Sequence, residues 1–144
     1  MDAISSWICD ECGDAIESPT KGLLAWDNGE RKSNFRIVHK GKCDVDRRQA
    51  TAELSSVTGF DGQVMLLSFL SYGPLIGAGN EPVRVADLDE WVDVFRRLQL
   101  PHYEEARILY RRGDVQERLA DANELYPYEP STMKRLLDEY RDEH

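Results

Sequence analysis

The sequence predicts an α+β protein, with a β-hairpin domain over residues 1–50 packed on a small α-helical array over residues 51–144. Three observations lead to this prediction. Apolar residues alternate on both sides of a turn signal within residues 22–43, as they do in a hairpin with one buried face. Apolar residues recur at helical spacing within residues 87–140, behind residues that cap helices. All three cysteines lie in the first third of the chain.

The composition is that of a globular protein rather than a disordered one. Apolar residues make up 41% of the 144 residues and charged residues 31%, which suits one domain or two small ones with a real core. The longest apolar run, Val64 to Leu67, cannot cross a bilayer, and no secretory signal is recognisable at the N-terminus. We therefore expect a cytoplasmic protein without membrane contact, in a compartment where thiols stay reduced.

The net charge of −9 is unevenly distributed along the chain. Residues 1–50 carry eight basic and nine acidic side chains, whereas residues 51–144 carry ten basic and eighteen acidic ones. An acidic surface repels phosphate backbones and anionic membranes, so it favours solubility or basic protein partners. The stretch from Arg31 to Arg48 is the exception, because it holds seven basic residues against two acidic ones.

The N-terminal segments are predicted to be extended. Trp7 and Ile8 lead into the tight turn CDECG at residues 9–13. The letters DNGE at residues 27–30 are a strong turn signal, with alternating apolar residues before and after them. This pattern predicts a hairpin with a turn longer than two residues, whose second strand ends at His39.

Two segments precede the predicted helical array. Residues 44–58 fit either a helix with its apolar residues inward or a partly extended segment, and both readings stay open. Residues 60–72, FDGQVMLLSFLSY, are apolar on nearly all sides. That distribution predicts a buried central helix, ended by the Gly-Pro pair that follows it.

The rest of the chain predicts four short helices, over residues 87–98, 101–113, 114–122 and 131–140. Asp87 with Glu90, and Asp114 with Glu117, have the spacing of capping pairs at helix starts. Pro101 suits a first helical turn, and Ser131 suits the start of the last helix. The residues predicted to face inward are Leu88, Trp91, Val92, Phe95, Leu98, Tyr103, Ala106, Leu109, Tyr110, Val115, Leu119, Ala122, Met133, Leu136, Leu137 and Tyr140.

The cysteines and one histidine form the pattern C-x2-C-x26-H-x3-C, made by Cys9, Cys12, His39 and Cys43. Thiolates and a neutral imidazole suit tetrahedral zinc, and a Cys3His set is a common closed structural site. Gly13 supports this interpretation, because the chain must double back after a C-x-x-C turn and glycine adopts positive φ at little cost. We therefore predict a structural Zn²⁺ ion, without which the first fifty residues would not fold.

Other interpretations of these residues are weaker. A redox pair of Cys9 and Cys12 would normally start a helix after a strand, and Gly13 and Pro19 argue against a helix here. A secreted disulfide scaffold would leave one of three cysteines unpaired. His39 as an ordinary strand residue is the remaining alternative, although its spacing from Cys43 favours ligation. Catalytic zinc keeps an open position, which four protein ligands would close.

The letters CDECG, the hairpin LLAWDNGERKSNFRIV, and the pair of His39 and Cys43 resemble the zinc-ribbon and treble-clef class of small zinc domains. The resemblance covers about a third of the chain, near residues 5–48, and implies metal binding rather than an activity. The three-residue gap between His39 and Cys43 departs from the usual two, which leaves ribbon and treble clef as alternatives. The helical remainder resembles no named family.

No catalytic residues or cofactor-binding motifs other than the zinc ligands are recognisable. We therefore expect a non-enzymatic binding or regulatory protein that contacts another protein through its acidic helical surface. Tyr126, Tyr128 and Glu124, in and beside the loop LYPYEP, are the predicted contact residues.

Two other functions stay open. The first is a nucleic-acid-binding regulator of the transcription type that uses the basic stretch. Its candidate anion-binding residues are Arg31, Arg36, Lys40, Lys42 and Arg47. The second is an enzyme with an unrecognised site.

Overall fold

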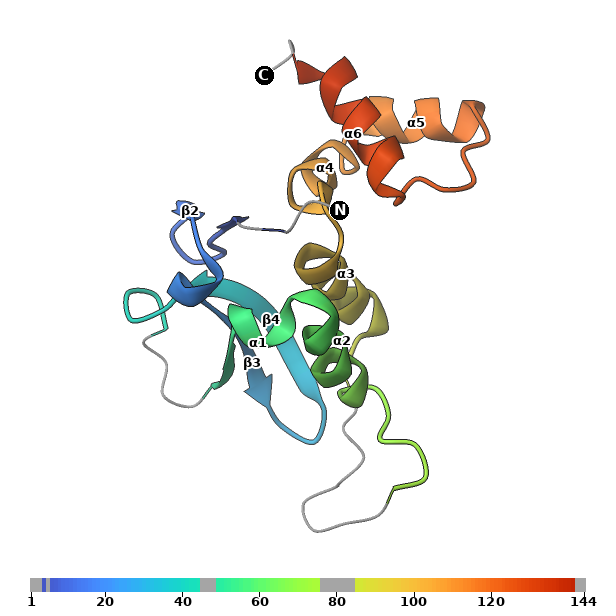
Figure 1. The fold of residues 1–144 in the computed structure, drawn as a ribbon. Helices are drawn as coiled ribbons and strands as arrows, with labels where there is room; N and C mark the ends of the chain where they lie inside the picture. Colours follow the sequence, from blue (N-terminus) through green and yellow to red (C-terminus); the bar gives the residue numbers. More distant parts are fainter. Residues whose placement is uncertain (1–3, 5, 45–48, 76–84, 142–144) are drawn as a thin grey trace. The chain divides into compact units, whose positions relative to one another are not determined.

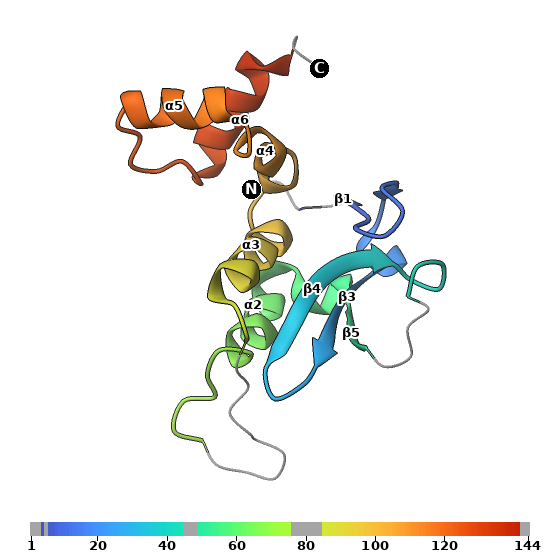
Figure 2. The ribbon, with the colours of Figure 1, turned by 180° about the vertical axis from the view of Figure 1, so that it is seen from behind.

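The computed structural model describes residues 4, 6–44, 49–75 and 85–141 (Figures 1 and 2). It confirms the α+β class, with the strands in the N-terminal part of the chain and most helices in the C-terminal part. The chain forms two compact units that divide between Gln99 and Leu100. The predicted domain boundary at residue 50 falls inside the first unit, because the strand that begins at Ala50 pairs with the hairpin.

Two small antiparallel sheets build the first unit. β1 (Trp7–Ile8) pairs with β2 (Ala15–Ile16) around the CDECG turn. After a short 3-10 helix, η1 (Pro19–Lys21), the predicted hairpin follows as β3 (Gly22–Asn28) and β4 (Lys32–His39). β5 (Ala50–Glu53) pairs with the other edge of β3, which gives the order β4-β3-β5. The hairpin is therefore confirmed and carries one more strand than predicted.

Residues 44–58, for which two conformations were open, contain both in succession. β5 is extended, and the single-turn helix α1 (Leu54–Val57) follows it directly. Leu54 and Val57 are fully buried and pack with the apolar residues of the sheet. The part of this stretch at residues 45–48 lies outside the described residues.

Helices α2 (Gly59–Ser68) and α3 (Leu88–Gln99) lie side by side against one face of the sheet (Figures 1 and 2). Four aromatic rings join these helices to the sheet: Trp26, Phe35, Phe69 and Trp91. Their ring centroids lie 4.9–6.3 Å apart, which is the range of favourable aromatic pairs. The ammonium group of Lys32 lies 5.8 Å from the Trp26 ring and 5.7 Å from the Phe69 ring, so it caps the cluster by cation–π contacts.

The prediction of a helix buried on all sides over residues 60–72 is wrong in one respect. α2 is helical, but only the face formed by Gly62, Leu66 and Phe69 is buried. Phe60 and Val64 point away from the core and are 81% and 72% exposed. The sequence could not show this, because a helix that is apolar on both faces has the same pattern whether one or both are covered.

The start of α3 also differs from the predicted capping box. Asp87 does cap the helix, since its Oδ1 accepts hydrogen bonds from the backbone N–H groups of Asp89 and Glu90. The Glu90 carboxylate, however, accepts from the N–H of Phe35 in β4 at 2.6 Å, so it joins the helix to the sheet. Leu88, predicted inward, is exposed, and Val94 and Arg97 are buried instead.

The second unit contains α4 (Tyr103–Leu109), α5 (Gly113–Asp121) and α6 (Pro130–Glu139), as predicted. The apolar faces are largely confirmed, because Tyr103, Ala106, Leu109, Val115, Met133, Leu136 and Tyr140 are buried. Two details are wrong. Asp114 does not cap α5 but lies in its first turn and pairs with Arg112, and Ala122 is exposed.

Gly62 permits the closest approach between α1 and α2. A Cβ atom at this position would lie 2.3 Å from the carbonyl carbon of Val57 and 2.7 Å from its carbonyl oxygen. These are backbone atoms, which cannot turn aside as a flexible side chain can. We predict that Gly62→Ala lowers the free energy of unfolding by about 1–3 kcal/mol, measured by chemical denaturation.

Gly113→Ala is the matched control, since a Cβ atom there meets nothing within 4 Å. It should leave stability unchanged or raise it by about 0.5 kcal/mol through a less flexible unfolded chain. Equal losses in the two variants would contradict this role of Gly62.

Candidate metal centre

Four potential metal ligands converge at one end of the first unit. Cys9 and Cys12 belong to the turn between β1 and β2, whereas His39 ends β4 and Cys43 lies in the turn that follows. The three sulfur atoms and one imidazole nitrogen all lie within 4.8 Å of one another. The structure therefore brings together the four residues that the spacing predicted.

The separations fit a tetrahedral site. The Sγ atom of Cys12 lies 3.4 Å from His39 Nδ1, and the Sγ atom of Cys43 lies 3.8 Å from the same nitrogen. Zinc–sulfur bonds of about 2.3 Å and zinc–nitrogen bonds of about 2.0 Å place sulfur and nitrogen roughly 3.5 Å apart in a tetrahedron. These residues are thus close enough, and of the right chemistry, to hold a metal ion.

The first turn has the geometry of a metal-binding knuckle. Gly13 has a φ of +81°, and its N–H donates to the carbonyl oxygen of Cys9 at 2.9 Å. The N–H of Cys9 donates in turn to the carbonyl oxygen of Asp14 at 2.9 Å. The expectation that glycine makes this reversal is confirmed, since positive φ is costly for residues with a Cβ atom.

A hydrogen bond on the outer side of His39 orients its imidazole. Nε2 lies 3.0 Å from the carbonyl oxygen of Ala15, which can only accept a hydrogen bond. The proton of the neutral ring therefore resides on Nε2, and the lone pair of Nδ1 faces the three sulfur atoms. Such outer partners hold metal-binding histidines in the correct tautomer.

The thiols of Cys9 and Cys43 differ in their pKa values. Burial raises the pKa of Cys9, but hydrogen bonds from the backbone N–H groups of Cys12, His39 and Glu11 outweigh it and bring the pKa to about 6. Burial, followed by the neighbouring thiols of Cys9 and Cys12, raises the pKa of Cys43 to about 11. Crowded sulfur atoms oppose a further negative charge, and a divalent cation among them removes that opposition.

Asp10, inside the turn, joins the site to the rest of the unit. Its Oδ2 atom accepts from the N–H of Ile37 at 2.8 Å and from Nη1 of Arg97 at 2.7 Å. Arg97 is only 3% exposed and also donates to the carbonyl oxygen of Ile8 at 3.1 Å. Trp7 completes the connection, since its indole N–H donates to the carbonyl oxygen of Arg97 at 2.9 Å.

Sequence reasoning missed this network. Asp10 and Arg97 are separated by 87 positions, and each resembles an ordinary charged surface residue in its own segment. The one usable signal was an arginine in the last turn of an amphipathic helix, on the face that also carries Val94 and Leu98. That signal does not identify the partner carboxylate.

Comparisons with family models, curated proteins and solved structures find no match. The function therefore has to be inferred from the residues of the chain. None of the helices in the described residues is long and apolar enough to cross a membrane.

The predicted anion-binding residues are mostly engaged with acidic neighbours. Arg36 lies 3.3 Å from Asp27 and also contacts Gln49. Lys40 pairs with Glu53 and, as the principal effect, lowers the pKa of that carboxyl group. These ion pairs reduce the positive field that a phosphate backbone would meet. Lys42 forms a longer, exposed ion pair with Asp14 at 3.8 Å, and Arg31 is exposed. Arg47 lies outside the described residues.

The predicted partner-binding residues have different roles in the second unit. Tyr126 is 62% exposed in the loop between α5 and α6, as expected. Tyr128 instead packs against Tyr103 and Tyr110, with ring centroids 6.0 and 5.6 Å away. Burial, followed by Tyr128 and Glu124, raises the pKa of Tyr110 to about 12, and its hydroxyl donates to the carbonyl oxygen of Pro127. Tyr128 thus has a structural role in addition to its partial exposure.

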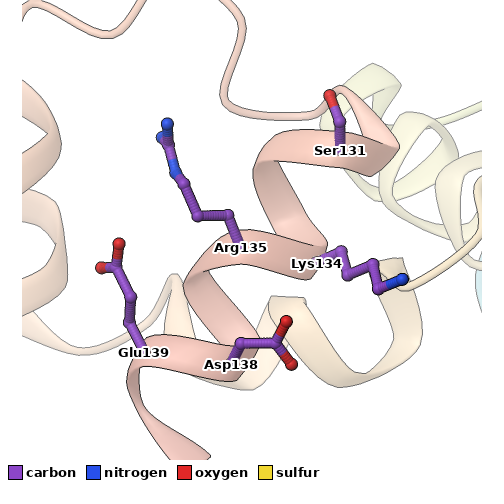
Figure 3. Close-up of a pocket in the computed structure, with 5 residues that line it drawn as sticks. All are labelled: Ser131, Lys134, Arg135, Asp138 and Glu139. Atoms are coloured by element: carbon purple, nitrogen blue, oxygen red, sulfur yellow. The ribbon is translucent and has the colours of Figure 1, made fainter.

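A shallow hollow of about 480 Å³ lies along α6 (Figure 3). Its lining side chains all come from that helix: Ser131, Lys134, Arg135, Asp138 and Glu139. Arg135 lies 3.6 Å from Glu124, and Glu139 pairs with Arg118, so two of the charges are already partnered. The lining contains neither a histidine nor a thiol, and it does not form a recognisable catalytic constellation.

We predict that Arg97→Met destabilises the first unit, because it removes the buried guanidinium that donates to the Asp10 carboxylate and to the Ile8 carbonyl. Loss of one member of a buried ion pair costs up to about 5 kcal/mol, and the partial exposure of Asp10 reduces our expectation to about 2 kcal/mol. Metal affinity should fall about tenfold as well, since outer partners position the ligands. Denaturant unfolding and competitive metal titration measure the two effects.

Lys40→Met is the control, because it breaks an ion pair of which both members are about half exposed. Such pairs contribute less than about 1 kcal/mol. A loss in Arg97→Met no larger than in this control would contradict the proposed connection.

Proposed function

We propose that this protein is a non-enzymatic, zinc-stabilised protein-binding module. Zinc held by Cys9, Cys12, His39 and Cys43 would stabilise the first unit, and the second unit would present the surface that contacts another protein. The proposal rests on one observation, which is the convergence of three sulfur atoms and one imidazole nitrogen within 4.8 Å.

The donor set supports zinc over other common ions. Calcium and magnesium prefer oxygen ligands, whereas soft sulfur ligands select zinc, copper(I) or iron–sulfur clusters. One histidine with three cysteines is a common ligand set of structural zinc. The second ligand pair comes from a strand end and a turn rather than a helix start, which favours a zinc ribbon over a treble clef.

The same ligand count supports a structural role. A catalytic zinc ion needs a free position for water or substrate, and four protein ligands occupy all positions of a tetrahedron. Cys9 and Cys12 lie between β1 and β2, while His39 and Cys43 lie at the end of β4. A shared ion would therefore link the turn between β1 and β2 directly to the end of β4.

The protein-binding surface would lie in the loop that joins α5 and α6. Leu125 and Tyr126 are adjacent and 70% and 62% exposed. Glu124 beside them pairs with Arg135 and also accepts from the N–H of Tyr126 at 3.2 Å, which orders the loop. Ordered, exposed aromatic and aliphatic side chains with a charged rim are typical of protein contact sites.

We predict that His39→Asn abolishes stoichiometric zinc binding, whereas His102→Asn leaves it intact. His102 is not one of the four clustered residues, and it adopts positive φ, which asparagine tolerates. Loss of an outer partner alone weakens metal sites by about 10- to 100-fold, so loss of a ligand should weaken the site more. Native mass spectrometry gives the zinc content of each variant.

The amide NMR spectrum of the protein without metal tests whether the ion is structural. Wild-type protein treated with a strong chelator should lose the dispersed amide signals of residues 7–16 and 39–43. Retention of those signals without metal would refute the structural role, and equal zinc contents in the two histidine variants would refute the ligand assignment.

For the contact surface, we predict that the double variant Leu125→Ala/Tyr126→Ala recovers at least one partner about tenfold less than wild type. Truncation of central aromatic anchors typically costs enough for such a loss. Tyr128 is left unchanged because it supports the packing of Tyr103 and Tyr110. Quantitative affinity purification measures the recovery of each protein.

Ile108→Ala is the matched control, since it removes another exposed aliphatic side chain of the second unit. Its recoveries should equal those of wild type. Unchanged recovery of every protein by the double variant would count against this surface.

A further inference from the structure

The exposed face of α2 is the most unusual surface of the first unit. Phe60, Val64 and Leu67 are 81%, 72% and 55% exposed, and we call these three residues the α2 stripe. Their spacing of four and three positions places them in one row along the helix. Leu70 and Leu75, which follow α2 in the chain, are also exposed.

The exposure of the α2 stripe does not result from poor packing of the helix. The opposite face is tightly packed, with Leu66 fully buried and Gly62 in close approach to the backbone of Val57. Exposed apolar residues scattered singly are normal, but contiguous apolar patches of this kind mark interaction sites. The helix is therefore held firmly on one side and presents a second apolar face on the other.

We propose that the α2 stripe binds a second copy of this chain, with the two α2 helices antiparallel across a twofold axis at Val64. The stripe is nearly symmetric about that residue. With a rise of about 1.5 Å per residue, Phe60 lies roughly 6 Å before Val64 and Leu67 roughly 4.5 Å after it. Antiparallel pairing thus sets Phe60 against the partner's Leu67 on each side, and Val64 against the partner's Val64 in the middle.

The α2 stripe carries almost no charge, which favours a second copy of the chain over a partner that binds through complementary charges. Between Gly59 and Leu75, Asp61 is the only charged residue, and it lies in the first turn of α2. The whole chain has a net charge of −9, so most other faces would oppose like charges when two copies meet. An isologous contact needs a surface that complements itself, and an uncharged stripe meets that need.

The apolar surface that two copies can bury against each other indicates how strong this contact is. A fully exposed apolar side chain loses on the order of 100 Å² of accessible surface when it becomes buried. The α2 stripe with Leu70 and Leu75 therefore provides roughly 400 Å² per copy, and about 800 Å² for the pair. Interfaces of this size lie at the weak end of specific ones, which indicates a reversible dimer with Kd of order 10–100 µM.

The test places like or opposite charges at position 64 of the two copies, where the twofold axis passes. Val64→Glu and Val64→Lys each place two like charges against each other in the dimer, so each variant alone should be monomeric by sedimentation equilibrium. An equimolar mixture of the two should associate again, because Glu then faces Lys across the axis. Val64 is largely exposed, so neither variant should unfold, and circular dichroism checks this.

Ile108→Glu is the control, since it puts a charge on an exposed aliphatic position elsewhere and should dimerise as wild type does. Three results would overturn the proposal: wild type that stays monomeric at about ten times the expected Kd, glutamate and lysine variants that still dimerise, or a mixture that does not associate. The last result would exclude the twofold pairing at Val64 even if a dimer exists.

Photo-crosslinking separates a second copy from other occupants. A benzoylphenylalanine residue at position 60, in a mixture of ¹⁴N- and ¹⁵N-labelled chains, should give mixed-isotope crosslinks to residues near Leu67. Crosslinks confined to residues 100–141 of the same chain would assign the α2 stripe to the second unit and overturn the proposal.

Discussion

The central constraint on the first unit is the approach of three sulfur atoms and one imidazole nitrogen to within 4.8 Å of one another. Backbone N–H groups stabilise the Cys9 thiolate, whereas burial and the neighbouring thiols raise the pKa of Cys43. A cation at the centre would relieve this opposition to negative charge while keeping the four residues together. The turn at Gly13, the end of β4 and the orientation of His39 all serve that one arrangement.

Asp10 extends the constraint from the ligands to the fold. It lies between Cys9 and Cys12, so any movement of the turn moves its carboxylate away from Ile37 and Arg97. Through Arg97 the turn is linked to α3, and through Glu90 the same helix is linked to β4. The outer edge of β4 is thereby covered by side chains, which protects it from pairing with other strands. These hydrogen bonds connect the four-residue cluster, the sheet and α3 within the first unit.

Each unit has its own exposed apolar surface. The loop with Leu125 and Tyr126 belongs to the second unit, and the α2 stripe lies on the outer face of a helix whose inner face is packed. Each is ordered by contacts of its own, and neither contains residues suited to catalysis. Exposed apolar surfaces of this kind are typical of contacts between protein chains, which is the basis of the two binding surfaces proposed above.

Local patterns in the sequence were sufficient to predict most of the helices and strands and the four candidate ligands. The hairpin, the turn at Gly13, most of the buried faces of α4 to α6 and the four ligand residues follow from short-range spacing, because strand alternation, helical periodicity and ligand chemistry depend on neighbours in the chain. Three features came only from the tertiary structure: β5 beside β3, the pairing of Asp10 with Arg97, and the open face of α2. Each depends on which surfaces meet across long stretches of sequence. The identity of a residue shows that its side chain prefers burial or a charged partner. Only the fold determines whether another part of the chain provides that burial or that partner.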